Sequence, residues 1–254
     1  MILPRIIKIQ KFIEQIQDIN IDEQETSSVV EISQVEDEIG YKIPDDFKYF
    51  SQRLGTGCIS NFVNLYCMNY KYLYGSNSLM MNIVELVSEL VKTIENVDIE
   101  NNDNIEQLPP GWTKPEIARC LTDWKEMGNE YVEVIKNGLM FGDFNSDRII
   151  FWDLRTYKYE DDSYDIYWYD RYTHGILEKP ILIGRSFTDF LRNFCYGHLP
   201  CQLIPNFCGN SNTRDVESSF YSFQEKGTGS PIYDEQGNIL AAARLSNYFW
   251  GGED

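Results

Sequence analysis

Residues 43–50 read Ile-Pro-Asp-Asp-Phe-Lys-Tyr-Phe, and Gly55-Thr56-Gly57 follows shortly after. Proline is favoured at the first position of a helix, and acidic residues in the first turn complement the helix dipole. Apolar side chains then recur at helical spacing, at Phe47, Phe50 and Leu54. Because glycine commonly ends a helix, the segment predicts a short amphipathic helix that begins at Pro44 and stops at Gly55.

Further helices are predicted on both sides of this segment. Residues 6–16 carry apolar side chains at helical spacing, and residues 83–94 give the clearest helical pattern in the chain. Ser28 and Glu31 form a capping-box signal for a helix that stops at Gly40. Two more short helices are predicted, one starting near Thr113 and one starting at Ser186 with Asp189 three residues later.

The strand signals concentrate in the second half of the chain. Residues 58–67 read as a strand, and an acidic loop rich in asparagine is expected over residues 95–111. Four short segments rich in aromatic and β-branched residues then follow, separated by turn residues, at 138–144, 148–154, 164–170 and 174–177. This spacing is typical of an antiparallel meander. Residues 202–230 look polar and loop-like, and residues 231–243 suggest a small hairpin.

The charge balance is strongly acidic. Among 254 residues, 40 acidic side chains against 22 basic ones give a formal net charge of −18. Such a surface repels nucleic-acid phosphates and anionic membranes and attracts cationic partners. We find neither a signal peptide nor a stretch near the roughly 20 apolar residues of a membrane span. Six cysteines then read as reduced thiols, and the sequence predicts a cytoplasmic protein without nucleic-acid or membrane partners.

Signals for catalysis are weak. The chain has two histidines, no nucleotide-binding P-loop, no dinucleotide fingerprint and no Gly-x-Ser-x-Gly motif. We therefore expect a protein that is not an enzyme and that carries no cofactor or metal. One alternative stays open, because Cys195, His198, Cys201 and Cys208 are spaced as four tetrahedral zinc ligands would be. In the other reading Cys195 is a core residue of the last helix and the other three lie in a loop.

Acidic and aromatic residues alternate around the predicted strand at 164–170. The calcium-loop spacing of aspartates is absent, so either a solvated hairpin end or a partner-binding face is expected there. Tyrosine and tryptophan beside charge are typical interface anchors. The candidate partner-binding residues are Asp161, Asp162, Tyr164, Asp165, Tyr167, Trp168 and Tyr169.

Five pieces of the chain follow one another in an informative order. They are Val35-Glu36-x-Glu38-Ile39-Gly40, Ile43-Pro44-Asp45-Asp46-Phe47, Gly55-Thr56-Gly57, Phe141-Gly142-Asp143 ahead of Ile149–Asp153, and Phe187-x-x-Phe190-Leu191. This order resembles the SUKH superfamily, in its Smi/Knr-type branch, over residues 27–196. Ile43 stands where that pattern usually has leucine, the 95–137 region is long, and residues beyond 200 lie outside the pattern.

The resemblance implies an α+β fold with a mixed, mostly antiparallel sheet and helices packed around it. It divides the chain into a SUKH-like domain over residues 1–200 and a C-terminal extension over residues 201–254. It also implies a non-catalytic binding role. Bacterial members of the superfamily are thought to be immunity proteins that neutralise toxins, often nucleases, and fungal members regulate cell-wall assembly. The acidic charge suits a basic toxin partner. We therefore expect an immunity protein, with a regulatory or scaffold protein that has no toxin partner as the alternative.

Overall fold

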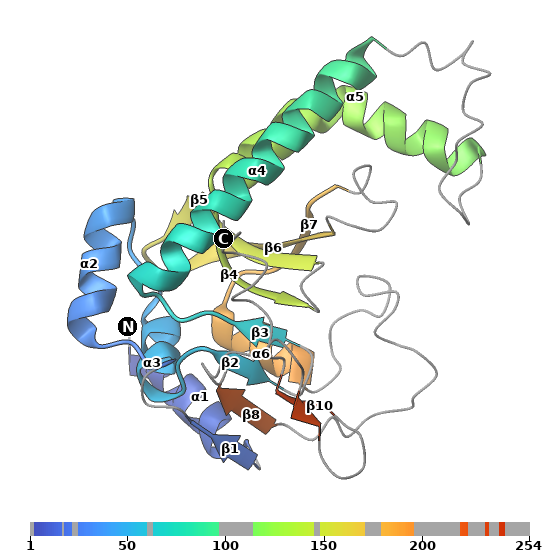
Figure 1. Ribbon diagram of the computed structural model, residues 1–254. Helices are drawn as coiled ribbons and strands as arrows, with labels where there is room; N and C mark the ends of the chain where they lie inside the picture. The colour runs from blue at the N-terminus through green and yellow to red at the C-terminus, as the bar shows by residue number, and fades with distance from the viewer. Residues whose placement is uncertain are drawn as a thin grey trace, which may run out of the picture.

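An antiparallel sheet organises the chain in the computed structural model (Figure 1). The structure describes residues 3–16, 18–21, 25–59, 63–96, 114–144, 148–170, 179–195, 219–222, 232–233 and 239–241. Six strands are neighbours in the order of the chain, namely β2 (Gly57–Ile59), β3 (Val63–Leu65), β4 (Gly138–Phe144), β5 (Arg148–Lys158), β6 (Ser163–Asp170) and β7 (Ile181–Gly184). Each runs antiparallel to the next. The predicted meander is confirmed in β4, β5 and β6, whereas the single strand predicted over residues 58–67 is wrong, because this segment folds back as the two antiparallel strands β2 and β3.

Two more strands extend the β2 edge of this sheet. β8 (Ser219–Ser222) pairs antiparallel with β2, and β1 (Asp18–Asn20) pairs parallel with β8. The sheet is therefore mixed and mostly antiparallel, which confirms the predicted α+β class. β8 comes from a stretch that the sequence suggested was loop-like, and its pairing with β2 places part of the last 54 residues in the sheet.

Helices cover both faces of the sheet. The described helices are α1 (Leu3–Glu14), α2 (Val29–Ile39), α3 (Asp45–Arg53), α4 (Tyr70–Glu95), α5 (Lys114–Lys136) and α6 (Phe187–Cys195). Ile150 and Trp152 of β5 lie in a core with α1, α2, α3 and α6. Their neighbours Ile149 and Phe151 lie in a second core with α4 and α5. Because successive strand residues point to opposite faces, the central strands are apolar on both sides.

The long helices α4 and α5 pack on each other and extend beyond the sheet (Figure 1). The sequence predicted only a short helix near Thr113, but α5 has 23 residues. Gly128 allows the close approach of these helices, since a Cβ atom there would lie 2.8 Å from Cγ2 of Val91 on α4. Within the described residues, no helix has both the length and the hydropathy of a membrane span.

Local sequence signals account for several helix ends. Ser28 and Glu31 form the complete capping box of α2, and Gly40 ends that helix with a φ of 70°. α3 starts at Asp45, one residue later than predicted, because Pro44 has an extended ψ of 137°. Ser186 accepts a hydrogen bond from the Asp189 amide at the start of α6, as its N-cap position predicts.

Some predicted elements fall outside the described residues. These are residues 97–111 of the predicted loop, whose first residue Glu95 is the last of α4, and the strand over residues 174–177. The predicted C-terminal hairpin is present, since β9 (Ile232–Tyr233) pairs antiparallel with β10 (Ile239–Ala241). The division of the chain at residue 200 stays a prediction.

The turn after α3 is fastened to the segment that precedes α2. Gly55 has a φ of 75°, and a Cβ atom at this position would lie 2.2 Å from the Glu25 carbonyl oxygen. The Thr56 amide donates to that same oxygen at 2.9 Å. The Thr56 hydroxyl accepts from the Cys67 amide, also at 2.9 Å. Gly55-Thr56-Gly57 is therefore a structural turn, as the sequence indicated.

Gly40 and Gly55 both have a left-handed backbone, but only Gly55 lies against another segment of the chain. Gly40 has a φ of 70° but no atom within 4 Å of its Cβ position. We expect Gly40→Ala to lower the free energy of unfolding by about 1 kcal/mol, the cost of a left-handed backbone for alanine. Gly55→Ala should lower it by about 3 kcal/mol, because the clash with Glu25 adds an overpacking cost. Urea unfolding followed by circular dichroism measures both values, and equal losses would contradict the close approach at Gly55.

Candidate protein-binding surface

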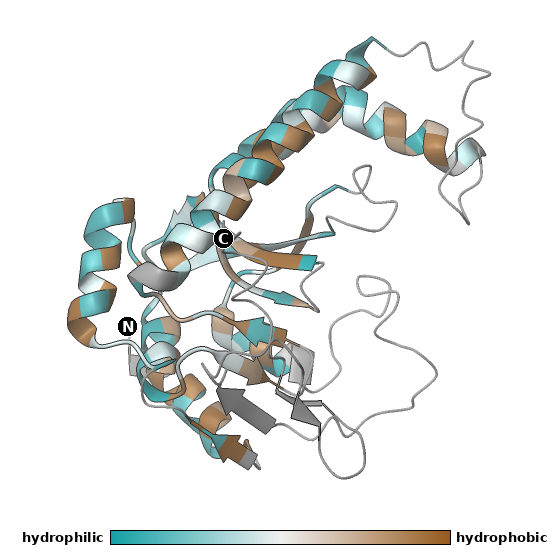
Figure 2. Cartoon of the chain, in the orientation of Figure 1, coloured by the Kyte–Doolittle hydropathy of each residue, from teal (hydrophilic) through white to brown (hydrophobic). Residues whose placement is uncertain are grey.

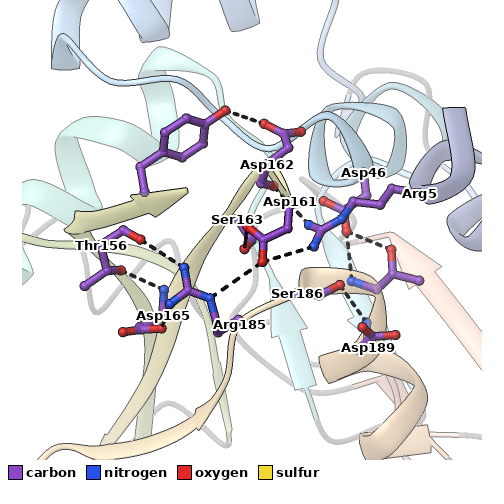
Figure 3. A network of polar contacts seen from close by, with 12 residues as sticks. Arg5, Asp46, Thr156, Asp161, Asp162, Ser163, Asp165, Arg185, Ser186 and Asp189 are labelled. Carbon is purple, nitrogen blue, oxygen red and sulfur yellow. Dashed lines mark hydrogen bonds and ion pairs between the residues drawn. The ribbon is translucent and has the colours of Figure 1, made fainter. Parts of the chain in front are cut away.

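The candidate residues from the sequence lie on the hairpin formed by β5 and β6. Register between these strands runs from Arg148 opposite Asp170 to Lys158 opposite Ser163, so the turn contains residues 159–162. Asp162 has a φ of 46°, which aspartate adopts more readily than most residues. The turn points toward α1 and the joint between α2 and α3, and polar contacts fasten it there (Figure 3).

Asp162 is the centre of one set of contacts. Its carboxylate accepts hydrogen bonds from the Lys42 ammonium at 2.9 Å, the Tyr157 hydroxyl at 2.6 Å and the Asp45 amide at 2.8 Å. The Tyr164 hydroxyl donates to the Lys42 carbonyl oxygen at 2.7 Å. Asp162 is only 6% exposed. These donors come from both the hairpin and the α2–α3 joint, so the carboxylate ties the hairpin end to the helices.

The pKa of Asp162 reports this environment. Burial alone would raise the pKa, but the hydrogen bonds from Tyr157, from the Asp45 amide and from Lys42 outweigh it and hold the pKa below its usual value. In the same cluster, burial and the neighbouring Asp162 carboxylate raise the pKa of Tyr157 to about 12. At neutral pH the cluster therefore contains a carboxylate anion, an ammonium and a neutral tyrosine.

Two arginines neutralise the neighbouring aspartates. Arg185 donates to the carboxylate of Asp165 and to the Thr156 carbonyl oxygen, the latter at 3.0 Å. Asp161 lies between Arg185 and Arg5, 3.8 Å from a guanidinium nitrogen of each (Figure 3). The acids of the hairpin end thus form an ion-pair network with basic residues from α1 and from the segment between β7 and α6.

Four of the seven predicted contact residues are buried. Tyr164 and Trp168 lie in the core under α1, α3 and α6, Tyr169 lies in the core under α4 and α5, and Asp162 is enclosed by its donors. The prediction required a hairpin with one face in solvent, but helices cover both faces of the sheet. In this fold these four side chains hold the structure together and are not accessible to a partner.

Three predicted contact residues keep accessible surface. Asp161 has a side chain that is 41% exposed, whereas Asp165 and Tyr167 are partly buried. Tyr167 stacks on Phe151 with ring centroids 5.9 Å apart. Partner binding by these three residues stays a prediction.

A more accessible surface lies on α2, and we did not anticipate it from the sequence. Its outward positions include Val29, Val30, Asp37 and Glu38, all exposed, with Tyr41 just beyond the helix. A regional count of charge would have indicated it, since residues 14–46 contain eleven acidic side chains and a single basic one, Lys42.

The structure offers little for a metal site. Among the described residues, no group of three or more histidine, cysteine, aspartate or glutamate side chains is placed to hold a metal ion. The alternative zinc ligands are not part of this finding, because the side chain of Cys195 and the residues His198, Cys201 and Cys208 lie outside the described part of the chain.

The Asp162 cluster yields a pH-dependent prediction. Because its pKa is lowered on folding, the contribution of Asp162 to stability is present above the unfolded pKa, near 3.9, and is lost as pH falls through the folded pKa. At pH 7 we expect Asp162→Asn to lower the free energy of unfolding by about 3 kcal/mol, since a buried ion pair loses one partner. As pH falls below the unfolded pKa this difference should shrink, because the carboxyl group becomes protonated first in the unfolded chain.

The adjacent Asp161 supplies the matched control. Its arginine partners are 3.8 Å away and its side chain is 41% exposed. Asparagine keeps an oxygen that can accept the 2.7 Å hydrogen bond from the Ser163 hydroxyl, so Asp161→Asn should cost less than about 1 kcal/mol. Urea unfolding at pH 7 and pH 3 compares the two variants with the parent chain. A loss for Asp162→Asn that is equally large at both pH values would contradict the assignment.

Comparison with known proteins places the fold in a family. A family model named SUKH_6 and described as SMI1-KNR4 cell-wall matches residues 30–191. The match begins in α2, spans the six-stranded meander and ends in α6, so it includes all the elements that hold the Asp162 cluster except α1. No curated protein and no solved structure matches the chain. Because the matched residues make up more than half of the chain, the protein belongs to the SUKH superfamily, in its SMI1-KNR4 family.

Proposed function

We propose that the chain is an immunity protein that neutralises a basic toxin, such as a nuclease domain, by binding it in the cytoplasm. The observation that carries this proposal is the family match over residues 30–191. Proteins of the SUKH family commonly bind protein partners, and they are generally not catalysts. The chain would thus act by binding another protein and not by catalysing a reaction.

The charge supports a cationic partner. With a net charge of −18, the chain attracts a basic protein over distances comparable to the Debye length and speeds their encounter. A nuclease must itself be positively charged where it binds phosphates, so an acidic surface can occupy the same cleft. Binding would then exclude the nucleic acid by competition for one site.

The buried carboxylates fit a role in the fold. Asp46 accepts hydrogen bonds from the amide and the hydroxyl of Thr188 at 3.0 and 2.8 Å. Asp143 accepts from the Asn64 amide at 2.8 Å and from the Tyr66 hydroxyl. These carboxylates join segments that are far apart in the chain, as Asp162 does. Such fully engaged groups support a structural use of the buried acids, consistent with a protein that is not an enzyme.

The family description favours a second function. The matched model is described as cell-wall, which fits a regulatory or scaffold protein of cell-wall assembly with no toxin partner. The two functions differ in one observable respect. An immunity protein protects a cell from a specific toxin, whereas a scaffold does not.

Co-expression with a toxin tests the proposal directly. The probe is the terminal domain of a multidomain toxin encoded beside the gene for this chain. We expect the chain to restore growth of cells that express this domain, and to form a complex with a dissociation constant on the order of 10 nM. Raising the salt concentration should slow association about tenfold, because the attraction is screened.

An unrelated toxin domain of similar positive charge is the control and should remain toxic. If the neighbouring domain is neither bound nor neutralised, the immunity function is refuted and the regulatory function gains support.

A further inference from the structure

The outward face of α2 combines exposed apolar side chains with unneutralised acids. Val29 and Val30 in its first turn are each 65% exposed, and Tyr41 beyond its last turn is 40% exposed. Asp37 and Glu38 lie between them on the same helix, and both are exposed. In Figure 1 this helix lies at the outer edge of the molecule, away from the sheet. Figure 2 shows it as mostly hydrophilic with hydrophobic ends.

The other acids of this region have partners in the fold. Glu31 completes the capping box with Ser28. Glu36 accepts from the Ile43 amide and pairs with Lys48, both at 2.7 Å. In the described part of the chain, by contrast, Asp37 and Glu38 make no ion pair. On α2, the negative charge that is exposed to solvent and not balanced by an ion pair therefore lies at these two positions.

The stability of α2 does not explain why valines stand exposed in its first turn. Valine is a poor helix former because its branched side chain loses rotamer freedom, and Ser28 already caps the helix. The residues that fasten α2 to the body are Ile32 and Val35, which are buried on its other face. Exposed apolar side chains on the same helix as exposed acids suit a surface that contacts another protein.

The helix is also held rigidly enough to present this face. It is capped at both ends, packed through Ile32 and Val35, and joined to α3 by the contacts of Glu36. A surface that is ordered before binding loses little conformational entropy when a partner docks. The β5–β6 hairpin, in contrast, uses its acids in internal ion pairs.

We propose that the outward face of α2, formed by Val29, Val30, Asp37, Glu38 and Tyr41, is the docking surface for a basic protein. This inference rests on the proposed function and specifies where the partner binds. The charge selects a basic partner over a second copy of this chain. Two copies docked through α2 would bring two acidic surfaces together, which like-charge repulsion disfavours.

Charge reversal on α2 tests the proposal with the toxin domain that the parent chain binds. Asp37→Lys combined with Glu38→Lys should weaken binding at least 100-fold, mostly through slower association, as expected for charges that steer encounter. The new lysines lie near the C-terminus of α2, where the helix dipole favours positive charge, so the fold should be retained. Val29→Ser combined with Val30→Ser should instead speed dissociation about tenfold, since apolar contact area is lost.

The matched control makes the same charge change elsewhere. Glu85 and Glu89 are exposed on α4, and Glu85→Lys combined with Glu89→Lys should weaken binding less than tenfold. Biosensor kinetics on all three double variants, with thermal unfolding to check folding, gives the comparison. Folded α2 variants that bind like the parent chain, or that lose no more than the α4 variant, would overturn the α2 surface while leaving the immunity function intact. A parent chain that does not bind at all would refute both.

Discussion

Burial of the central strands on both faces is the constraint that the rest of the structure follows. β5 sends Ile150 and Trp152 into one core and Ile149 and Phe151 into the other. Neither core is complete without helices, so α1, α3 and α6 cover one face and α4 and α5 cover the other. Many of the aromatic residues that identify the strands in the sequence are buried in these two cores. Trp152, for example, stacks on Phe141 and meets Phe47 edge to face.

Buried carboxylates then join elements that are distant in the chain. Asp46 joins α3 to α6, Asp143 joins β4 to the region of β3, and Asp162 joins the β5–β6 hairpin to the α2–α3 joint. Each carboxylate has several donors, which offsets the cost of removing the charge from water. The acidic residues of this chain therefore serve two purposes. Some hold the fold together, and only the remainder gives the surface its charge.

Much of the fold could be predicted from the sequence because its signals are local. The capping box at Ser28, the stop at Gly40 and the apolar spacing of α3 depend on neighbours within a few residues, and the strands β4 to β6 show the expected composition. β1 could not be predicted in this way, because the three residues Asp18, Ile19 and Asn20 form a strand only through a partner about 200 residues away. The binding surface was harder still. Alternation along β6 indicates two faces but cannot show that both are covered, so Tyr164 and Trp168 looked available when they are core residues. A regional charge count points to the α2 region, but identifying which of its residues are exposed and free of ion pairs required the structure.

The placement of β8 between β1 and β2 has a consequence for how the protein is made. Asp18 pairs with Ser219, so the first strand leaves the ribosome about 200 residues before its partner. At ordinary rates of synthesis that interval lasts on the order of ten to forty seconds. Until β8 is synthesised, β2 lacks its partner on that side of the sheet, and an open strand edge is a template for pairing with another chain. The sheet is thus completed only after residues 219–222 have been made, and these residues protect the β2 edge from pairing with another chain.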